Sequence, residues 1–181
     1  PWQAMDQIEE NDELALQATD GPFMYLTFNA SRPPFDNPKV RQAVAHAIKR
    51  EDIAAAAFYG RGGALEHLPI AEGSEFYNPE LANSWNYDPE KAQALLAEAG
   101  YPDGFDCVML STAQYGMHQS TAEVCQAYLS MIGINVQLDL PEWSTRVKKG
   151  NEGTYDLAVM GTAAMNNVPD GLATVVDGSL S

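Results

Sequence analysis

The chain has 181 residues, which is enough for one domain with a sizeable core or for two small ones. Its 10 Lys and Arg against 25 Asp and Glu give a formal net charge of −15, and such a surface repels a nucleic-acid backbone and an anionic membrane. The acidic charge therefore excludes nucleic acid as a partner. With 45% hydrophobic and 19% charged residues the composition is that of an ordinary globular chain and not of a disordered one. No apolar run approaches the ~18 residues that a membrane-spanning helix needs.

The first segments of the chain are expected to form an acidic leader followed by extended structure. Residues 1–13 carry several acids and no Lys or Arg, which is typical of a solvated leader. Two extended segments are expected next, Leu14–Thr19 and Met24–Asn29, with the turn signal Asp20-Gly21-Pro22 between them. The proline-rich Ser31–Phe35 suits neither a helix nor a central strand.

Two helices are predicted from an N-cap residue followed by proline at the first helical position. Asn37-Pro38 begins the first of them, and its apolar residues recur at helical spacing: Val40, Val44, Ala47 and Ile48. Asp88-Pro89 begins the second, which ends at Gly100 and carries one apolar face: Ala92, Leu95, Leu96 and Ala99. A further helical run covers Glu51–Tyr59, and Gly60–Tyr87 is expected to be a surface excursion with little regular structure.

The second half of the chain alternates strands with helices. Strands are expected at three segments: Phe105–Ser111, Ile134–Leu140 and Tyr155–Gly161. Helices are expected between them at Gln119–Ile132 and Glu142–Gly150. Because each connection has the length of a helix, the pattern predicts an α/β fold with a parallel sheet flanked by helices.

Catalytic and metal-binding motifs are absent from the sequence. His46, His67 and His118 are scattered, and Cys107 and Cys125 are 18 positions apart, so no zinc-ligand spacing exists. The two cysteines either pair in an oxidising compartment or fill the core, and the core interpretation is favoured. There is neither a phosphate loop nor a Gly-x-Ser-x-Gly elbow. We therefore expect no enzyme, no cofactor and no metal.

Two loops are candidates for a binding surface, because ligands of open parallel sheets approach the carboxyl ends of the strands. The loop Thr112–His118 follows the first of the three strands, and Thr162–Val168 follows the last. Their neutral hydrogen-bonding and soft apolar side chains suit binding better than reaction. The candidate ligand-binding residues are Tyr115, Met117, His118, Thr162, Met165, Asn166 and Asn167.

Several stretches together resemble one known family, the ABC-transporter extracytoplasmic solute-binding proteins of family 5, the oligopeptide, dipeptide and nickel class. The matching stretches keep their order over about residues 22–172. They are Tyr25–Asn29, Pro33–Asn37, Val40–Ala43, Tyr87–Ala92, Leu95–Phe105, Ile132–Ile134, Glu142-Trp143 and Gly153–Asp156. These motifs mark the fold: Arg41, for example, is expected to tie its helix to neighbouring loops.

The resemblance implies one lobe of a type II periplasmic-binding-protein-like fold, with a parallel or mixed sheet. It implies an acidic leader at 1–13 near the inter-lobe boundary, a single incomplete ligand-binding lobe at 14–172, and a truncated tail at 173–181. The partners it implies are the missing N-terminal lobe of the same chain, a small-molecule or peptide ligand enclosed by hinge motion, and ABC permease subunits. The implied location is periplasmic, or extracellular and membrane-tethered in an organism without a periplasm. The alternative is an effector-sensing domain of a transcription regulator, since such proteins reuse this fold.

Two departures from the family pattern bear on the ligand. Peptide-binding members carry Gly-Trp-x-x-Asp after the last strand, and the aspartate pairs with the ammonium group of the peptide. Here Met165 stands at that position and Thr162 replaces the tryptophan. The arginine for the carboxylate of a dipeptide, expected near Gln119, is also missing. The ligand is therefore not expected to be a free dipeptide, and a longer peptide, a sugar, an opine-like compound or a metal chelate remains open.

Overall fold

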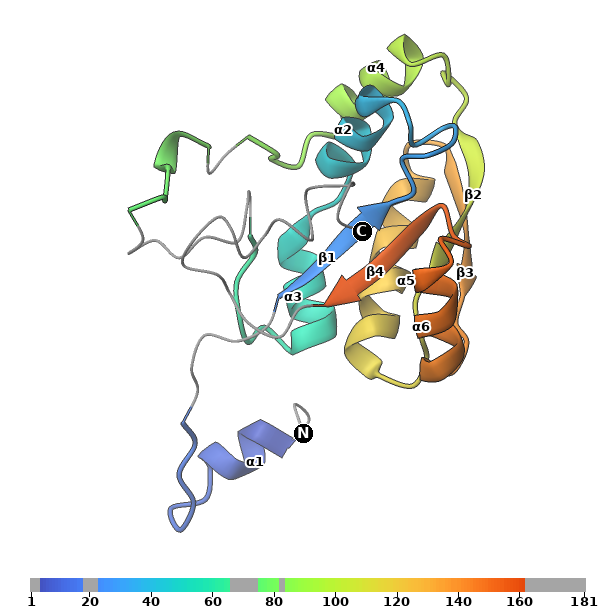
Figure 1. Ribbon diagram of the computed structural model, residues 1–181. Helices are drawn as coiled ribbons and strands as arrows, with labels where there is room; N and C mark the ends of the chain where they lie inside the picture. The colour runs from blue at the N-terminus through green and yellow to red at the C-terminus, as the bar shows by residue number, and fades with distance from the viewer. Residues whose placement is uncertain (1–3, 18–22, 66–74, 82–83, 162–181) are drawn as a thin grey trace. The chain divides into compact units, whose positions relative to one another are not determined.

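The computed structural model describes residues 4–17, 23–65, 75–81 and 84–161 (Figure 1). The chain divides into two compact units. Unit 2 comprises Tyr25–Ala64 and Trp85–Met160, and unit 1 comprises the remaining segments. The described elements of unit 1 are helix α1 (Met5–Glu9) and the 3-10 helix η2 (Pro79–Leu81), and neither buries a side chain.

One expectation for the start of the chain needs correction. The leader predicted at 1–13 includes the short helix α1, which buries no side chain. The extended segment predicted at Leu14–Thr19 forms no strand over its described part, 14–17. The exposed fractions of Leu14 and Leu16 are 54% and 39%, so the alternating pattern has no buried face that would fix it as a strand.

Unit 2 is built on a four-stranded sheet in the order β1-β4-β2-β3. The strands are β1 (Met24–Phe28), β2 (Phe105–Leu110), β3 (Ile134–Asp139) and β4 (Leu157–Gly161). β2 pairs in parallel with β3 along its whole length, whereas its parallel ladder with β4 has only two pairs, Met109 with Leu157 and Leu110 with Ala158. The predicted parallel sheet is thus confirmed for these three strands.

β1 runs in the opposite direction to its neighbour β4, as the two arrows in Figure 1 show. The Asn29 N–H, just after β1, donates to the carbonyl of Asp156, just before β4, at 2.9 Å. The sheet is therefore mixed, with one antiparallel strand beside three parallel ones.

The predicted helix starts are confirmed where a capping residue precedes proline. Asn37 accepts a hydrogen bond from the Lys39 N–H at the start of α2 (Pro38–Ala47), and Asp88 accepts one from Lys91 at the start of α4 (Pro89–Glu98). The other helices are α3 (Arg50–Phe58), α5 (Gly116–Ser130) and α6 (Trp143–Asn151). Over the described part of 60–87 the only regular element is η2, as expected for a surface excursion.

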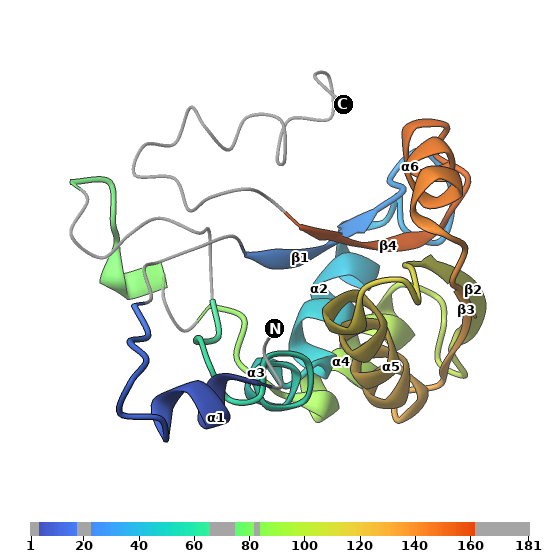
Figure 2. The same ribbon diagram turned by 90° about the horizontal axis from the view of Figure 1, so that it is seen from below.

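The core of unit 2 lies between one face of the sheet and the helices α2, α4 and α5, while α6 lies on the opposite side (Figure 2). The predicted apolar stripe of α2 is buried, with exposed fractions from 0 to 5%. Cys107 on β2 and Cys125 on α5 are both buried and free, so the core interpretation holds for the two cysteines. Burial raises the pKa of each thiol to about 12.

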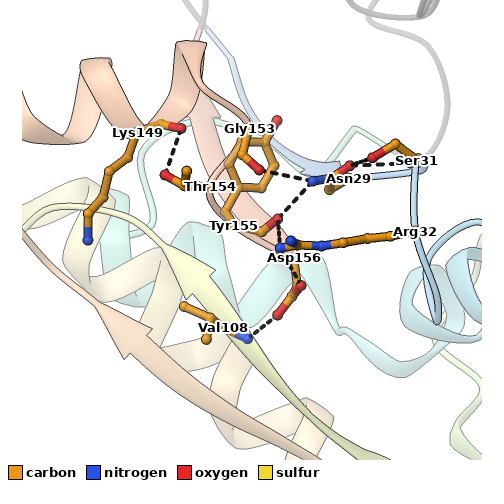
Figure 3. Close-up of polar contacts among 9 residues, drawn as sticks. All are labelled: Asn29, Ser31, Arg32, Val108, Lys149, Gly153, Thr154, Tyr155 and Asp156. Atoms are coloured by element: carbon orange, nitrogen blue, oxygen red, sulfur yellow. Dashed lines mark hydrogen bonds and ion pairs between the residues drawn. The ribbon is translucent and has the colours of Figure 1, made fainter.

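The amino ends of the parallel strands are closed by contacts within the chain (Figure 3). The side chain of Asp156 accepts from the Val108 N–H at 2.8 Å and pairs with Arg32 at 2.9 Å. The amide of Asn29 donates to the carbonyls of Gly153 and Tyr155 at 3.0 and 3.2 Å. We call this region, with Gly104 before β2 and Gly133 before β3, the amino edge.

Arg41 also has the structural role expected of it. Its guanidinium donates to the carbonyl oxygens of Phe35 and Asp36, at 2.6 and 3.1 Å, and so ties α2 to the proline-rich loop. The motif that contains Arg41 is thus a marker of the fold and does not point to a ligand.

Candidate ligand-binding edge

The carboxyl ends of β2, β3 and β4 meet on one side of unit 2, because the three strands are parallel. The segment after β2 leads into α5, and the segment after β3 leads into α6. We call residues 111–118, 141–146 and 159–160 the carboxyl edge.

Hydrogen bonds between the two segments hold the starts of α5 and α6 together. The Thr112 hydroxyl donates to the carbonyl of Pro141 at 2.7 Å, and the Trp143 N–H donates to the Gln114 side-chain oxygen at 2.9 Å. Within the first segment, the Ser111 hydroxyl donates to the carbonyl of His118 at 2.9 Å. The edge is therefore a positioned surface formed by two neighbouring segments.

Three rings gather at this edge. The centroid of Trp143 lies 5.2 Å from that of Tyr115 and 5.6 Å from that of His118, and both pairs are edge-to-face. Tyr115 is 42% exposed, whereas His118 is buried. Small-molecule sites are commonly lined by aromatic side chains together with a few placed polar groups.

Arg146 brings a buried positive charge to the same cluster. Its guanidinium carbon lies 5.4 Å from the centroid of the Trp143 ring. Arg146 as a whole is only 5% exposed. One terminal nitrogen, Nη2, donates to the carbonyl of Val159 and lies 2.7 Å from the sulfur of Met160. Val159 lies in the part of β4 that continues beyond Ala158, the last residue of β4 that pairs with β2. The Arg146 guanidinium therefore takes the place of a hydrogen bond that the β2–β4 ladder does not provide.

Two buried nitrogen atoms of the cluster have no hydrogen-bond partner in the described part of the chain: Nδ1 of His118 and Nε of Arg146. Burial lowers the pKa of His118 below its usual value, and the nearby Arg146 charge lowers it further. The imidazole is therefore neutral at pH 7. Burial also lowers the pKa of Arg146, but a guanidinium stays charged throughout the physiological range.

The start of α6 is fixed by Glu142. Its carboxylate accepts from the backbone N–H groups of Ser144 and Thr145 at 2.9 and 2.8 Å, as an N-cap does. Hydrogen bonds from the Ser144 and Thr145 hydroxyls, with these backbone bonds, lower the pKa of Glu142 to about 2. This cap positions Trp143 and Arg146 on the first turn of the helix.

Three of the predicted ligand-binding residues lie at the carboxyl edge. Tyr115 precedes α5, whereas Met117 and His118 lie on its first turn and not on a loop as expected. Tyr115 is the N-cap residue of α5, but its side chain makes no capping hydrogen bond. The sequence therefore held no capping signal for a helix that begins at Gly116 and not at Gln119 as expected. The other four, Thr162, Met165, Asn166 and Asn167, lie outside the described residues.

Sequence reasoning missed Trp143 and Arg146 as candidates for the site. Trp143 entered only as a marker of the family, together with Glu142. The available signal was the position of both residues on the first turn of the helix that follows β3, which places them beside the loop after β2.

Other kinds of site were searched within the described residues. They contain no group of three or more His, Cys, Asp or Glu side chains that could hold a metal ion. In the same residues, every helix is too short or too polar to cross a bilayer.

Comparison with known proteins assigns the family. Residues 1–179 match the bacterial extracellular solute-binding proteins, family 5, in their middle region. The chain therefore belongs to family 5 of the bacterial extracellular solute-binding proteins.

Individual relatives are consistent with this assignment. The glutathione-binding protein GsiB of Pectobacterium atrosepticum is 36% identical over 142 residues, which are 76% of this chain and 26% of that protein. The solved structure of AgaA from A. tumefaciens R10 in complex with agropinic acid has a TM-score of 0.89 and 41% identity, and the match covers 96% of this chain and 35% of that one.

A third relative is an ABC transporter-associated periplasmic binding protein, DppA from Helicobacter pylori, solved in complex with the peptide STSA. Its TM-score is 0.82 at 28% identity, over 95% of this chain and 33% of that one. The chain thus spans about a quarter to a third of the length of these relatives.

Proposed function

We propose that this chain is part of the extracytoplasmic solute-binding component of an ABC importer. The observation that carries the proposal is the family match over residues 1–179, together with the likeness to AgaA at a TM-score of 0.89. The relatives described above are binding proteins by name, and the proposed role requires no bond to be made or broken. We accordingly propose that the protein is not an enzyme.

The carboxyl edge supplies the physical basis for one wall of a ligand site. Tyr115 and Trp143 offer aromatic surface, while His118 and Arg146 offer buried polar groups. The proposed contacts to ligand are Tyr115, Met117, His118, Thr162, Met165, Asn166 and Asn167. The second wall would come from an N-terminal lobe of the same protein, and closure of the two lobes would bury the solute.

Delivery to permease subunits in the membrane and a periplasmic location complete the proposal. One of the structural relatives, DppA of H. pylori, is an ABC transporter-associated periplasmic binding protein. The alternative of an effector-sensing domain in a transcription regulator uses the same fold, but the relatives named above favour transport.

A thermal-shift screen of the complete protein that contains this chain tests the proposal. Agropinic acid, glutathione and the peptide STSA are the first probes, because relatives bind them. At a concentration 100 times its Kd, a solute adds about 2.7 kcal/mol to the free energy of unfolding, which is a readily measured rise in Tm. Hydrolysis of a probe without any rise in Tm would contradict the proposal.

A further inference from the structure

The segment between β2 and α5 has an exposed tip. Residues 113–116 are all exposed, and a Cβ added at Gly116 would have open space around it. Tyr115, one of the proposed contacts to ligand, lies in this tip. Because none of its side chains is buried, the tip depends on hydrogen bonds and on ring contacts for its position relative to the rest of the carboxyl edge.

The side chain of Gln114 joins the tip to α6. Its Oε1 accepts from the Trp143 backbone N–H at 2.9 Å, and the Gln114 N–H donates to the Thr112 hydroxyl at 3.2 Å. Gln114 precedes Tyr115 in the sequence, and the rings of Tyr115 and Trp143 meet edge-to-face at 5.2 Å between centroids. This one bond therefore links the backbone beside the first ring to the backbone that carries the second.

Gln114 also completes the cap of α6. The first backbone N–H groups of a helix have no partner within the helix. The Glu142 carboxylate accepts from Ser144 and Thr145, and Gln114 accepts from Trp143. Glu142 belongs to the same segment as α6, whereas Gln114 comes from the neighbouring one. The cap supplied by Gln114 therefore holds two segments in one arrangement.

The other bond between the two segments differs in burial. Thr112 is fully buried, and its hydroxyl donates to the carbonyl of Pro141 at 2.7 Å, so it belongs to the packed base of the edge. Gln114 is exposed, and water can replace its oxygen at the Trp143 N–H when the side chain is removed. Loss of Thr112 should therefore act on the fold, and loss of Gln114 on the placement of the rings.

We propose that Gln114 is a positioning residue for solute binding, which holds Tyr115 against Trp143 through the cap of α6. A solute that packs on the two rings then meets a surface already in its bound arrangement, and binding does not include the cost of ordering it. Gln114 acts through the rings, so its own side chain need not touch the solute. The inference rests on the proposed function and deepens it.

The first experiment measures the ring pair in the complete protein without a solute. Nuclear Overhauser effects between the rings of Tyr115 and Trp143 are recorded after selective labelling of tyrosine and tryptophan. We expect them in the wild type and in Gln114→Glu, which keeps an acceptor oxygen, and expect them to be reduced by about half or more in Gln114→Ala. Gln119→Ala is the matched control, because the Gln119 amide donates to Glu123 within α5 at 2.8 Å, and it should leave the ring pair unchanged.

The second experiment tests whether Gln114 acts through the ring of Tyr115. Isothermal titration with agropinic acid, glutathione and the peptide STSA measures the effect of Gln114→Ala in the wild type and in Tyr115→Ala. Tyr115 is 42% exposed, so this background keeps the fold, and it retains the bond from Gln114 to α6. We expect Gln114→Ala to weaken binding about fivefold in the wild type and less than about 1.5-fold in Tyr115→Ala. A merely structural cap would lower Tm and affinity alike in both backgrounds.

Several results would overturn the inference. Ring contacts that are unchanged in Gln114→Ala, or lost equally in Gln114→Glu, would show that the acceptor oxygen does not hold the rings. Normal affinity in Gln114→Ala would show that the tie is unimportant for binding, and a fivefold loss that persists in Tyr115→Ala would assign Gln114 to direct contact or to the fold. In each case the wild type still binds a probe, so the proposed function stands. If no probe binds the wild type, the proposed function falls and the inference falls with it.

Discussion

The ladder between β2 and β4 is short, and a charged side chain lies at each of its ends. At the amino end Asp156 accepts from the Val108 N–H and pairs with Arg32. At the carboxyl end Arg146 donates to Val159 but leaves its Nε without a partner in the described residues. Each side chain lies at one end of the β2–β4 ladder. Asp156 has a partner of opposite charge within the described chain, whereas Arg146 does not.

The difference separates groups that specify the fold from groups that are available to a ligand. The amino edge is satisfied by contacts within the chain, so changes there should act on stability. The carboxyl edge has the exposed ring of Tyr115 and two buried nitrogen atoms without a partner in the described residues, so changes there should act on binding. Each of the following variants tests one side of this division.

The largest effect is expected at the amino edge from Gly104→Ala. Gly104 has φ +79°, and a Cβ at this position would overlap the backbone carbonyl of Gly133. We expect a loss of about 3 kcal/mol or more in the free energy of unfolding, measured in urea. Gly100→Ala is the matched control, because Gly100 has φ +92° but no atom within 4 Å of the added Cβ, and it should cost only about 1 kcal/mol. Equal losses in both variants would mean that the contact with Gly133 is unimportant.

A smaller loss is expected from Asp156→Ala. The change leaves the part-buried Val108 N–H without its acceptor, which should cost about 2 kcal/mol in the free energy of unfolding. The ion pair contributes little to this figure, because Arg32 is 51% exposed. Asp106→Ala on β2 removes an exposed carboxylate bonded to Asn135 at 3.0 Å and should change stability by less than about 0.5 kcal/mol. If the two variants unfold at the same urea concentration, Asp156 does not close the ladder.

On the carboxyl edge, Tyr115→Ala should weaken solute binding while leaving the fold intact. We expect about a tenfold loss of affinity in the complete protein, with the free energy of unfolding changed by less than about 0.5 kcal/mol. Isothermal titration with the solute that gives the largest thermal shift measures the affinity. Met131→Ala, at the far end of α5 and 61% exposed, is the control and should bind normally. Instability of Tyr115→Ala without any change in affinity would assign Tyr115 to the fold.

The smallest effect is a pH dependence of stability from His118. Its pKa in the folded chain is lowered, chiefly by burial, so below pH ~6.5 the unfolded chain binds more protons than the folded one. The contribution of neutral His118 is complete above pH ~6.5 and is lost as the pH falls towards the lowered pKa. Thermal unfolding between pH 8 and 5 should show this decline in the wild type and a weaker one in His118→Gln. Parallel curves for the two proteins would contradict it.

Local signals in the sequence predicted much of unit 2. Asn37-Pro38 and Asp88-Pro89 mark helix starts because a cap and a proline act within one turn, whatever surrounds them. The alternation of strands and helices from Phe105 onward predicted the parallel strands, because the connections had helical length. The direction of β1 was not predicted, since no local signal shows which neighbour an isolated strand will pair with.

The place of the carboxyl edge in the fold was predicted, but two of the residues that form it were not. The rule for open sheets located Tyr115, Met117 and His118 at the carboxyl edge, because it depends only on strand direction. Trp143 and Arg146 were missed because their roles depend on the packing of α6 against β4. The short β2–β4 ladder that makes room for Arg146 is a property of the sheet register, which the sequence pattern does not contain.

The two buried cysteines give this molecule an internal reporter. A thiol with a pKa near 12, enclosed by a strand on one side and a helix on the other, is unreactive towards alkylating reagents until the structure around it opens. The rate of modification of Cys107 measures the opening of β2, and that of Cys125 measures the opening of α5. Any solute that holds the start of α5 in place should slow alkylation of Cys125, so the chain can register occupancy without an added label.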